Sequence, residues 1–133
     1  VDEARQLAEM TPFSGYVHAL SNAKERADLI KGFKNGSIKT IFNVSVLTTG
    51  FDYPGLDTII IARPTMSLAL YVQMVGRGMR IAPGKDKCSV IDMCGNVKRF
   101  GKVEELTIVE DEKFGWVLKN GYKILSGRRL DEV

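Results

Sequence analysis

The chain has 133 residues, of which 44% are hydrophobic and 26% are charged. These values are typical of one globular domain that buries a single sizeable core. The apolar runs, such as residues 58–62, are too short to span a bilayer, so no membrane partner is expected. The net charge of +3 permits an anionic partner without requiring one. The chain opens without Met and in mid-pattern, and we expect it to be a fragment of a longer protein.

Charge is unevenly distributed in the second half of the chain. Between Arg77 and Lys102 there are seven basic residues and two acidic ones. Five acidic residues follow directly: Glu104, Glu105, Glu110, Asp111 and Glu112. The basic stretch is either a surface for an anionic partner or an ordinary solvated face, and both interpretations stay open.

The cysteine and histidine content predicts no metal site. Cys88 and Cys94 lie six residues apart, without zinc-type spacing, and His18 is the only histidine. We interpret both cysteines as reduced residues in or near the core, which favours a cytoplasmic location.

The first half of the chain predicts a helix over 2–9, a short strand within 15–20, a helix over 22–34 and a strand over 38–44. The second helix has the clearest signals. Asn22 and Glu25 have capping-box spacing, and Asn35 with Gly36 forms a stop. Its predicted apolar stripe consists of Ala23, Ala27, Ile30 and Phe33.

The second half predicts a strand over 57–62, a helix over 68–76 capped by Ser67, and a strand over 87–93. The apolar runs of both strands are typical of strands buried on both faces. Residues 103–109 and 115–125 are further candidate strands, the latter a hairpin over Asn120-Gly121. The order α-β-α-β-β-α-β indicates an α/β domain with a largely parallel sheet.

The stretch "QMVGRGMR", residues 73–80, combines two arginines with two glycines. At about 100° per residue, Gly76, Arg77 and Arg80 project on the side of Gln73. The opposite side carries Leu68, Tyr71, Val72, Val75 and Met79. Two guanidiniums on one ridge suit a polyphosphate, and Gly76 and Gly78 would leave that face bare. A solvated basic helix end is the alternative, whereas Ile81 excludes a dinucleotide fingerprint.

A second polar cluster lies in "NVSVLTTGFDYPGLD", residues 43–57, after a predicted strand. Asn43, Ser45 and Thr48, with Thr49 and backbone amides, are able to hold phosphate oxygens. Gly50 permits a tight bend, and Asp52 beyond it has acceptors for ribose hydroxyls. An ordinary turn with a helix cap is the alternative.

Together the two stretches resemble a pair of motifs found in superfamily 2 helicases. "SVLTTGFDYPGLDTIIIARPT" resembles motif V, and "YVQMVGRGMR" resembles motif VI, with the pattern Gln-x-x-Gly-Arg-x-x-Arg. The likeness covers residues 1–97 and is closest to the DEAD/DEAH-like group that includes RadD-type bacterial helicases. It implies a three-layer RecA-like (P-loop NTPase-like) domain with a mostly parallel central sheet over residues 1–102. Residues 103–133 would be an extension packed on the same domain.

The resemblance also implies roles for individual residues. Arg77 and Arg80 would face the γ-phosphate of ATP, with Arg80 as an arginine finger, and Gln73 would orient the phosphate or the attacking water. Gly50, Asp52 and Gly76 would contact the nucleotide. Three residues would contact single-stranded DNA or RNA: Asn43, Ser45 and Thr48.

The phosphate-binding loop and acidic box of these enzymes belong to a first RecA-like domain that this sequence lacks. That domain would be the partner that holds ATP and Mg²⁺, so this chain alone should be inactive as an ATPase. His18-Ala19 replaces the His-Gly of many relatives, and nothing after about residue 100 maps onto the family. Two alternatives stay open: a nucleic-acid-binding module and a structural domain with a degenerate ATP site.

Overall fold

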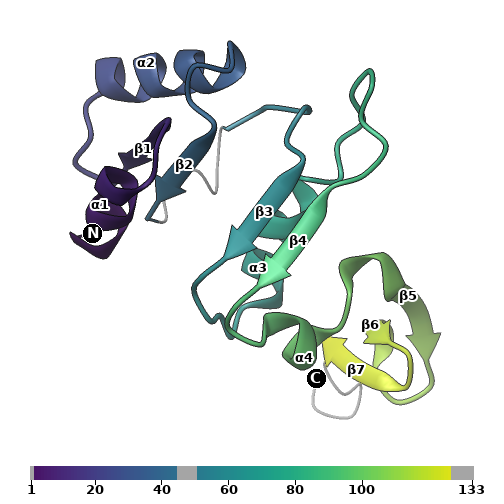
Figure 1. Cartoon of the computed structure of the whole chain (residues 1–133). Helices are drawn as coiled ribbons and strands as arrows, with labels where there is room; N and C mark the ends of the chain where they lie inside the picture. The colour runs from purple at the N-terminus through teal and green to yellow at the C-terminus, as the bar shows by residue number, and fades with distance from the viewer. Residues whose placement is uncertain (1, 45–50, 127–133) are drawn as a thin grey trace. The chain divides into compact units, whose positions relative to one another are not determined.

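The computed structural model describes residues 2–44 and 51–126, which belong to two compact units (Figure 1). The units are Val1–Tyr53 and Pro54–Val133, and each is described by itself. The predicted order of elements is confirmed as far as the fourth strand, after which the structure adds a short helix, a 3₁₀ turn and three strands.

The first unit consists of two parallel strands and two helices. These are α1 (Asp2–Met10), β1 (Ser14–Val17), α2 (Ala23–Lys34) and β2 (Thr40–Asn43). The strands pair in register from Ser14 with Thr40 to Val17 with Asn43. Helix α2 makes the crossover that parallel strands require. Val17, the last residue of β1, is 1% exposed and is the most buried residue of the pair.

Helix α2 begins with the predicted capping box. The side chain of Asn22 accepts a hydrogen bond from the Glu25 amide (2.9 Å), and the Glu25 carboxylate accepts one from the Asn22 amide (3.0 Å). The predicted apolar stripe is wrong at Ala23 and Ala27, which are exposed, whereas Ile30 and Phe33 are half-buried. Leu29 instead lies against Gly15 of β1, so closely that a Cβ on Gly15 would overlap it.

The second unit begins with a parallel strand pair backed by a helix. Its elements are β3 (Thr58–Ile61), α3 (Leu68–Gly76), β4 (Ser89–Asp92), α4 (Asn96–Phe100) and the 3₁₀ turn η1 (Val103–Glu105). Figure 1 shows α3 behind the β3–β4 pair. Ile61, Tyr71, Val75 and Phe100 form the core, in which the rings of Tyr71 and Phe100 stack 5.3 Å apart.

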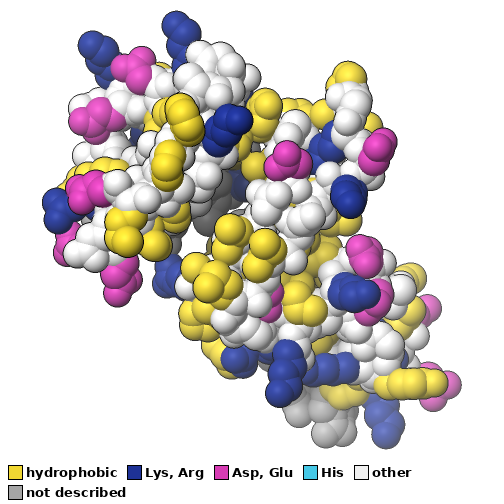
Figure 2. Space-filling view, viewed as in Figure 1, with side chains coloured by type: hydrophobic (Ala, Val, Ile, Leu, Met, Phe, Trp, Pro, Cys, Tyr) yellow, Lys and Arg dark blue, Asp and Glu magenta, His cyan; other side chains and the backbone are white. Residues whose placement is uncertain are grey.

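The prediction that both strands are buried on both faces is wrong. Ile60 is 57% exposed and Ile91 is 49% exposed, and Figure 2 shows hydrophobic side chains gathered over β3 and β4. Successive side chains of a strand point to opposite faces. Ile59 and Ile61 pack into the core cluster, so Ile60 between them points away from it.

A three-stranded antiparallel sheet follows, composed of β5 (Leu106–Asp111), β6 (Gly115–Asn120) and β7 (Lys123–Ser126). The predicted hairpin exists, but its turn is shifted by one residue. Asn120 pairs with Lys123, so the two turn residues are Gly121 and Tyr122. Gly121 has φ +55°, which favours glycine over residues with a side chain.

The strands within residues 2–44 and 51–126 form three small sheets: two parallel pairs and the antiparallel sheet. An α/β chain with parallel pairing is therefore confirmed, whereas a single central sheet stays a prediction. Within the same residues, no helix combines the length and the apolar character needed to cross a bilayer.

Asn96 is the only fully buried polar side chain among the described residues, at 0% exposed. Its Oδ1 accepts from the Thr65 amide (2.9 Å), and its Nδ2 donates to the Arg63 carbonyl (3.1 Å) and the Asp92 carboxylate (2.9 Å). Burial acts to raise the pKa of Asp92, but hydrogen bonds from Val97, Cys94 and Asn96 together lower it. Asn96 thereby joins the loop before α3 to the end of β4.

Replacing Asn96 with Ala should lower the free energy of unfolding by about 2–4 kcal/mol, because buried partners lose their hydrogen bonds. Urea denaturation of this chain measures the change. Asn35→Ala is the matched control, since Asn35 is exposed and its side chain accepts from the Ser37 amide alone in a local turn. Similar losses for the two variants would contradict the role assigned to Asn96.

Candidate functional site

Helix α3 begins at the predicted residue for a local reason. The Ser67 hydroxyl accepts a hydrogen bond from the Leu70 amide (3.2 Å), which caps the first turn. The Thr65 hydroxyl in turn accepts from the Ser67 amide (3.0 Å). Because Asn96 holds the Thr65 backbone, the start of α3 is joined to the buried hydrogen-bond network.

The far end of α3 carries the motif VI residues. The helix ends at Gly76, with Arg77 as its C-cap in helical conformation. Gln73 and Arg80 are exposed, and Arg77 is half-buried. Gln73, Gly76 and Arg77 are spaced as i, i+3 and i+4, so the structure places them on one side of the helix end.

Arg80 lies beyond the helix, directly after a tighter turn. The Gly78 amide donates to the Val75 carbonyl (2.9 Å), and the Met79 amide donates to the Gly76 carbonyl (3.2 Å). Such i→i+3 bonds tighten the chain over residues 75–79, directly before Arg80. Met79 is 55% exposed, so its predicted place on the core side is wrong. The helical spacing used for that prediction ends at Gly76.

The two glycines of motif VI serve different purposes. A Cβ on Gly78 would overlap the Cys88 sulfur and lie 3.0 Å from Ile59 Cδ1, so Gly78 permits close packing against β3 and β4. The prediction that Gly78 keeps a ligand-facing surface bare is therefore wrong. A Cβ on Gly76 would meet no described atom within 4 Å. Gly76 leaves the backbone open beside Arg77.

In the first unit, aromatic contacts determine how Asp52 is presented. Phe51 is 7% exposed and its ring lies 6.1 Å from that of Phe33, and Tyr53 packs edge-on against the same ring at 5.3 Å. Because both neighbours of Asp52 contact α2, its own side chain is exposed. Asp52 thus has the exposure that a ligand contact requires.

Asn43 is exposed at the carboxyl end of β2, opposite Val17 at the end of β1. A concavity of about 380 Å³ lies at this end of β1, lined by Tyr16, Val17, His18, Leu20, Ser21 and Glu25. Carboxyl ends of parallel strands are where such sheets hold ligands. Sequence analysis considered His18 as a metal ligand and as part of a departure from the family's His-Gly pair, and not as part of a concave site. Ser45, Thr48 and Gly50 lie outside the described residues.

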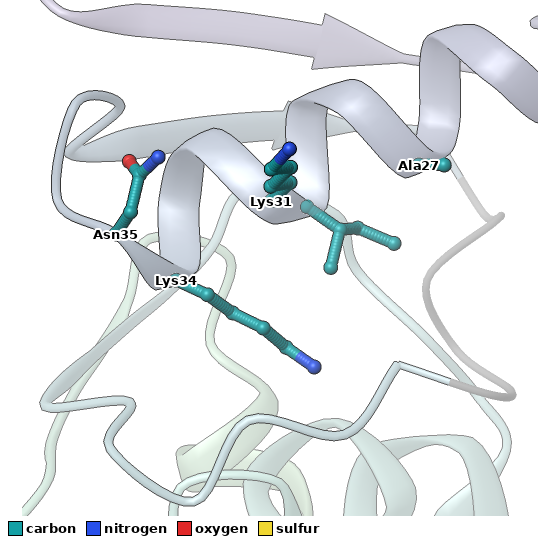
Figure 3. Close-up of a pocket in the computed structure, with 5 residues that line it drawn as sticks. Ala27, Lys31, Lys34 and Asn35 are labelled. Atoms are coloured by element: carbon teal, nitrogen blue, oxygen red, sulfur yellow. The ribbon is translucent and has the colours of Figure 1, made fainter.

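A further concavity of about 510 Å³ lies against α2 (Figure 3). It is lined by Ala27, Ile30, Lys31, Lys34 and Asn35. All five belong to α2 and its C-cap, so the hollow is one side of a single helix and contains none of the predicted site residues.

The chain belongs to the family described as the helicase conserved C-terminal domain, whose family model matches residues 4–82. The matched range contains both polar clusters, from Asn43 to Arg80. The resemblance to the C-terminal domain of superfamily 2 helicases is thereby confirmed. The RadD-type subgroup stays a prediction, since the relatives described next are fungal and viral.

Two of the proteins similar to this chain come from yeasts. IRC3 of Saccharomyces cerevisiae, named as an ATP-dependent helicase, is 41% identical over 80 residues. Its counterpart in Schizosaccharomyces pombe, named as a mitochondrial ATP-dependent helicase, is 42% identical over 79 residues. The matches cover 60% and 59% of this chain but only 12% and 13% of those proteins. The chain therefore spans a small part of these relatives.

A protein of Sulfolobus islandicus filamentous virus, named as a helicase, is 27% identical over 118 residues, which cover 84% of this chain and 21% of the viral protein. Coverage that large must extend past residue 102 into β5. The sequence interpretation found no likeness to the family beyond about residue 100, and this relative extends the likeness.

Among solved structures, the C-terminal domain of the DEAD-box protein Dbp5 resembles this chain with a TM-score of 0.52 and 23% identity. The likeness covers 67% of this chain and 52% of that one. At this identity the comparison supports a shared fold.

Substituting the two motif VI glycines separately tests the roles assigned to them. Gly78→Ala should lower the free energy of unfolding by about 1–3 kcal/mol, because its Cβ overpacks against Cys88. Gly76→Ala should leave it unchanged or raise it by up to about 1 kcal/mol, because Ala is the better helix former. Urea denaturation of both variants measures the difference, and equal destabilisation would refute the distinction.

Proposed function

We propose that this chain is the second motor domain of an ATP-dependent nucleic-acid helicase or translocase. The observation that carries the proposal is the open ridge at the end of α3, where exposed Gln73 and Arg80 flank Gly76 and Arg77. Two guanidiniums three residues apart beside a bare backbone suit a triphosphate. Membership of the helicase C-terminal family supports this interpretation over that of a solvated basic helix end.

In the proposed mechanism, ATP lies between this domain and a first RecA-like domain of the same protein. Arg80 acts as the arginine finger and Arg77 assists it, stabilising charge that develops during phosphoryl transfer. Gln73 orients the phosphate or the attacking water. Asp52 contacts the ribose, and Gly50 is assigned a nucleotide contact by the family resemblance.

Mg²⁺ would be held mainly by the first domain and would neutralise phosphate charge during transfer. The described residues contain no group of three His, Cys, Asp or Glu side chains suited to an ion. As the family resemblance implies, the proposal assigns the Mg²⁺ ligands to the first domain, and the donors of this chain toward the nucleotide are cationic and amide groups.

Single-stranded DNA or RNA is the proposed polymer. Asn43, together with Ser45 and Thr48, would contact its sugar–phosphate backbone, since a motor has to move along any sequence. The exposure of Asn43 at the carboxyl end of β2 supports that part. A cytoplasmic location stays a prediction.

We further propose that residues 1–102 form a three-layer RecA-like domain with a mostly parallel central sheet. The two parallel strand pairs and the fold likeness support this. Residues 103–133 would pack on the same domain. Support comes from Leu125 of β7 against the core, and from Asn120 Nδ2, which donates to the Lys102 carbonyl (3.2 Å).

Arg80→Ala in the full-length protein should reduce kcat for ATP hydrolysis by about 10³-fold or more, the usual cost of losing an arginine finger. Nucleotide binding should change far less, because the first domain holds most of the phosphate contacts. Steady-state kinetics and nucleotide titration measure the two quantities. The control is Arg5→Ala, an exposed arginine of α1 whose ion pairs with Asp2 and Glu9 are at 3.7 and 3.9 Å. An unchanged kcat for Arg80→Ala would remove the proposed role.

This chain by itself should hydrolyse ATP negligibly, because it supplies only one side of the nucleotide site. Hydrolysis is measured in steady state with single-stranded DNA present, with the intact protein as reference. Turnover near that of the intact protein would overturn the proposal. DNA binding that responds to salt but not to the first domain and ATP would favour a nucleic-acid-binding module instead.

A further inference from the structure

The ammonium group of Lys85 gathers three backbone carbonyls at the end of motif VI. Its Nζ donates to the carbonyls of Gly78 (2.7 Å), Arg80 (2.8 Å) and Pro54 (2.9 Å). An ammonium has three N–H groups, so these bonds use its full capacity. Sequence analysis counted Lys85 among the seven basic residues of 77–102, which were expected to face either an anionic partner or solvent. In the structure the ammonium of Lys85 instead binds backbone carbonyls of the chain itself.

A local turn brings Lys85 to this place. The Lys85 amide donates to the Ala82 carbonyl (3.1 Å), and Gly84 between them has φ +73°. Pro83 followed by a glycine with positive φ is the residue pair that a type II turn requires. The chain therefore reverses after Arg80, and the half-buried Lys85 returns to the carbonyls it binds.

Cationic capture of these carbonyls has a clear physical cause. The last carbonyls of a helix and of the turn after it have no intrahelical donor, and they carry the negative end of the helix dipole. Three carbonyls that converge on one point suit a compact ammonium. The planar fork of arginine directs its N–H groups apart and fits such a point less well.

We infer that Lys85 is the positioning residue for Arg80, which fixes the backbone from which the finger projects. This inference rests on the proposed function. Through Pro54, Lys85 also binds the segment two residues after Asp52 in the chain, so the backbone of motif V and the turn of motif VI share one donor. Loss of the ammonium would free the Arg80 carbonyl while leaving the Arg80 side chain chemically intact.

The test uses the full-length protein and compares Lys85→Met, Lys85→Arg and Arg80→Ala. Lys87→Met is the matched control, an exposed lysine two residues away. Lys85→Met should lower kcat by about 10²-fold, the cost of displacing a catalytic group by about 1 Å. KM and ADP affinity should change by less than about threefold, while tight binding of ADP–aluminium fluoride, a mimic of the transferring phosphoryl group, is lost. Lys85→Arg should also lower kcat and weaken the binding of ADP–aluminium fluoride, although it keeps the positive charge.

A double variant separates a positioning role from a general loss of structure. If Lys85 acts through Arg80, then Arg80→Ala with Lys85→Met hydrolyses ATP no more slowly than Arg80→Ala alone. Multiplying losses would overturn the inference, as would a normal kcat for Lys85→Met beside a slow Arg80→Ala. A normal kcat for Arg80→Ala would contradict the proposed function itself, independently of the role of Lys85. Should Lys85→Met melt below the assay temperature, Lys85→Gln, which keeps two donors, is judged by the same comparison.

Discussion

The arrangement of motif VI depends on how the carbonyls at the end of α3, which have no donor within the helix, find hydrogen-bond donors outside it. A helix that stops must satisfy its last carbonyls, and this one stops at Gly76, just where the arginines begin. Two i→i+3 bonds tighten the turn, and Lys85 binds the next carbonyls. Hydrogen bonds donated by Gly78, Met79 and Lys85 thus hold the backbone on its path to Arg80.

The two glycines of motif VI have opposite surroundings, because one is packed against neighbouring strands and the other borders open space. Gly78 lies against Cys88 and Ile59, where a side chain has no room, and Gly76 borders open space. Burial is the main cause that raises the pKa of Cys88, which favours the neutral thiol under this turn. A glycine pattern alone therefore does not identify a ligand surface, since one of these two glycines is explained by packing.

Local signals in the sequence predicted what local chemistry determines. The capping box of Asn22, the Ser67 cap and the end of α3 at Gly76 were confirmed, because each depends on residues within one helical turn. Contacts between distant segments were missed. Asn96 binds the Arg63 carbonyl 33 residues away, and Lys85 binds Pro54 31 residues away. The periodicity of a sequence does not predict contacts between such distant residues. The predicted turn of the β6–β7 hairpin was displaced by one residue, because strand register depends on cross-strand packing. The roles in catalysis came from the family resemblance and remain proposals.

The charge pattern that first suggested an anionic partner divides into separate parts in the structure. Lys85 binds backbone carbonyls, and Lys102 pairs with Glu105 of the following acidic run at 3.6 Å. Lys98 and Arg99 belong to the last turn of α4, where the negative end of the helix dipole favours cations. The basic residues of 77–102 therefore have different surroundings. Lys98, Arg99 and Lys102 are still exposed, so the alternative of a nucleic-acid-binding module stays open. Within this stretch, Arg77 and Arg80 of motif VI are the basic residues to which the proposed function assigns a nucleotide contact.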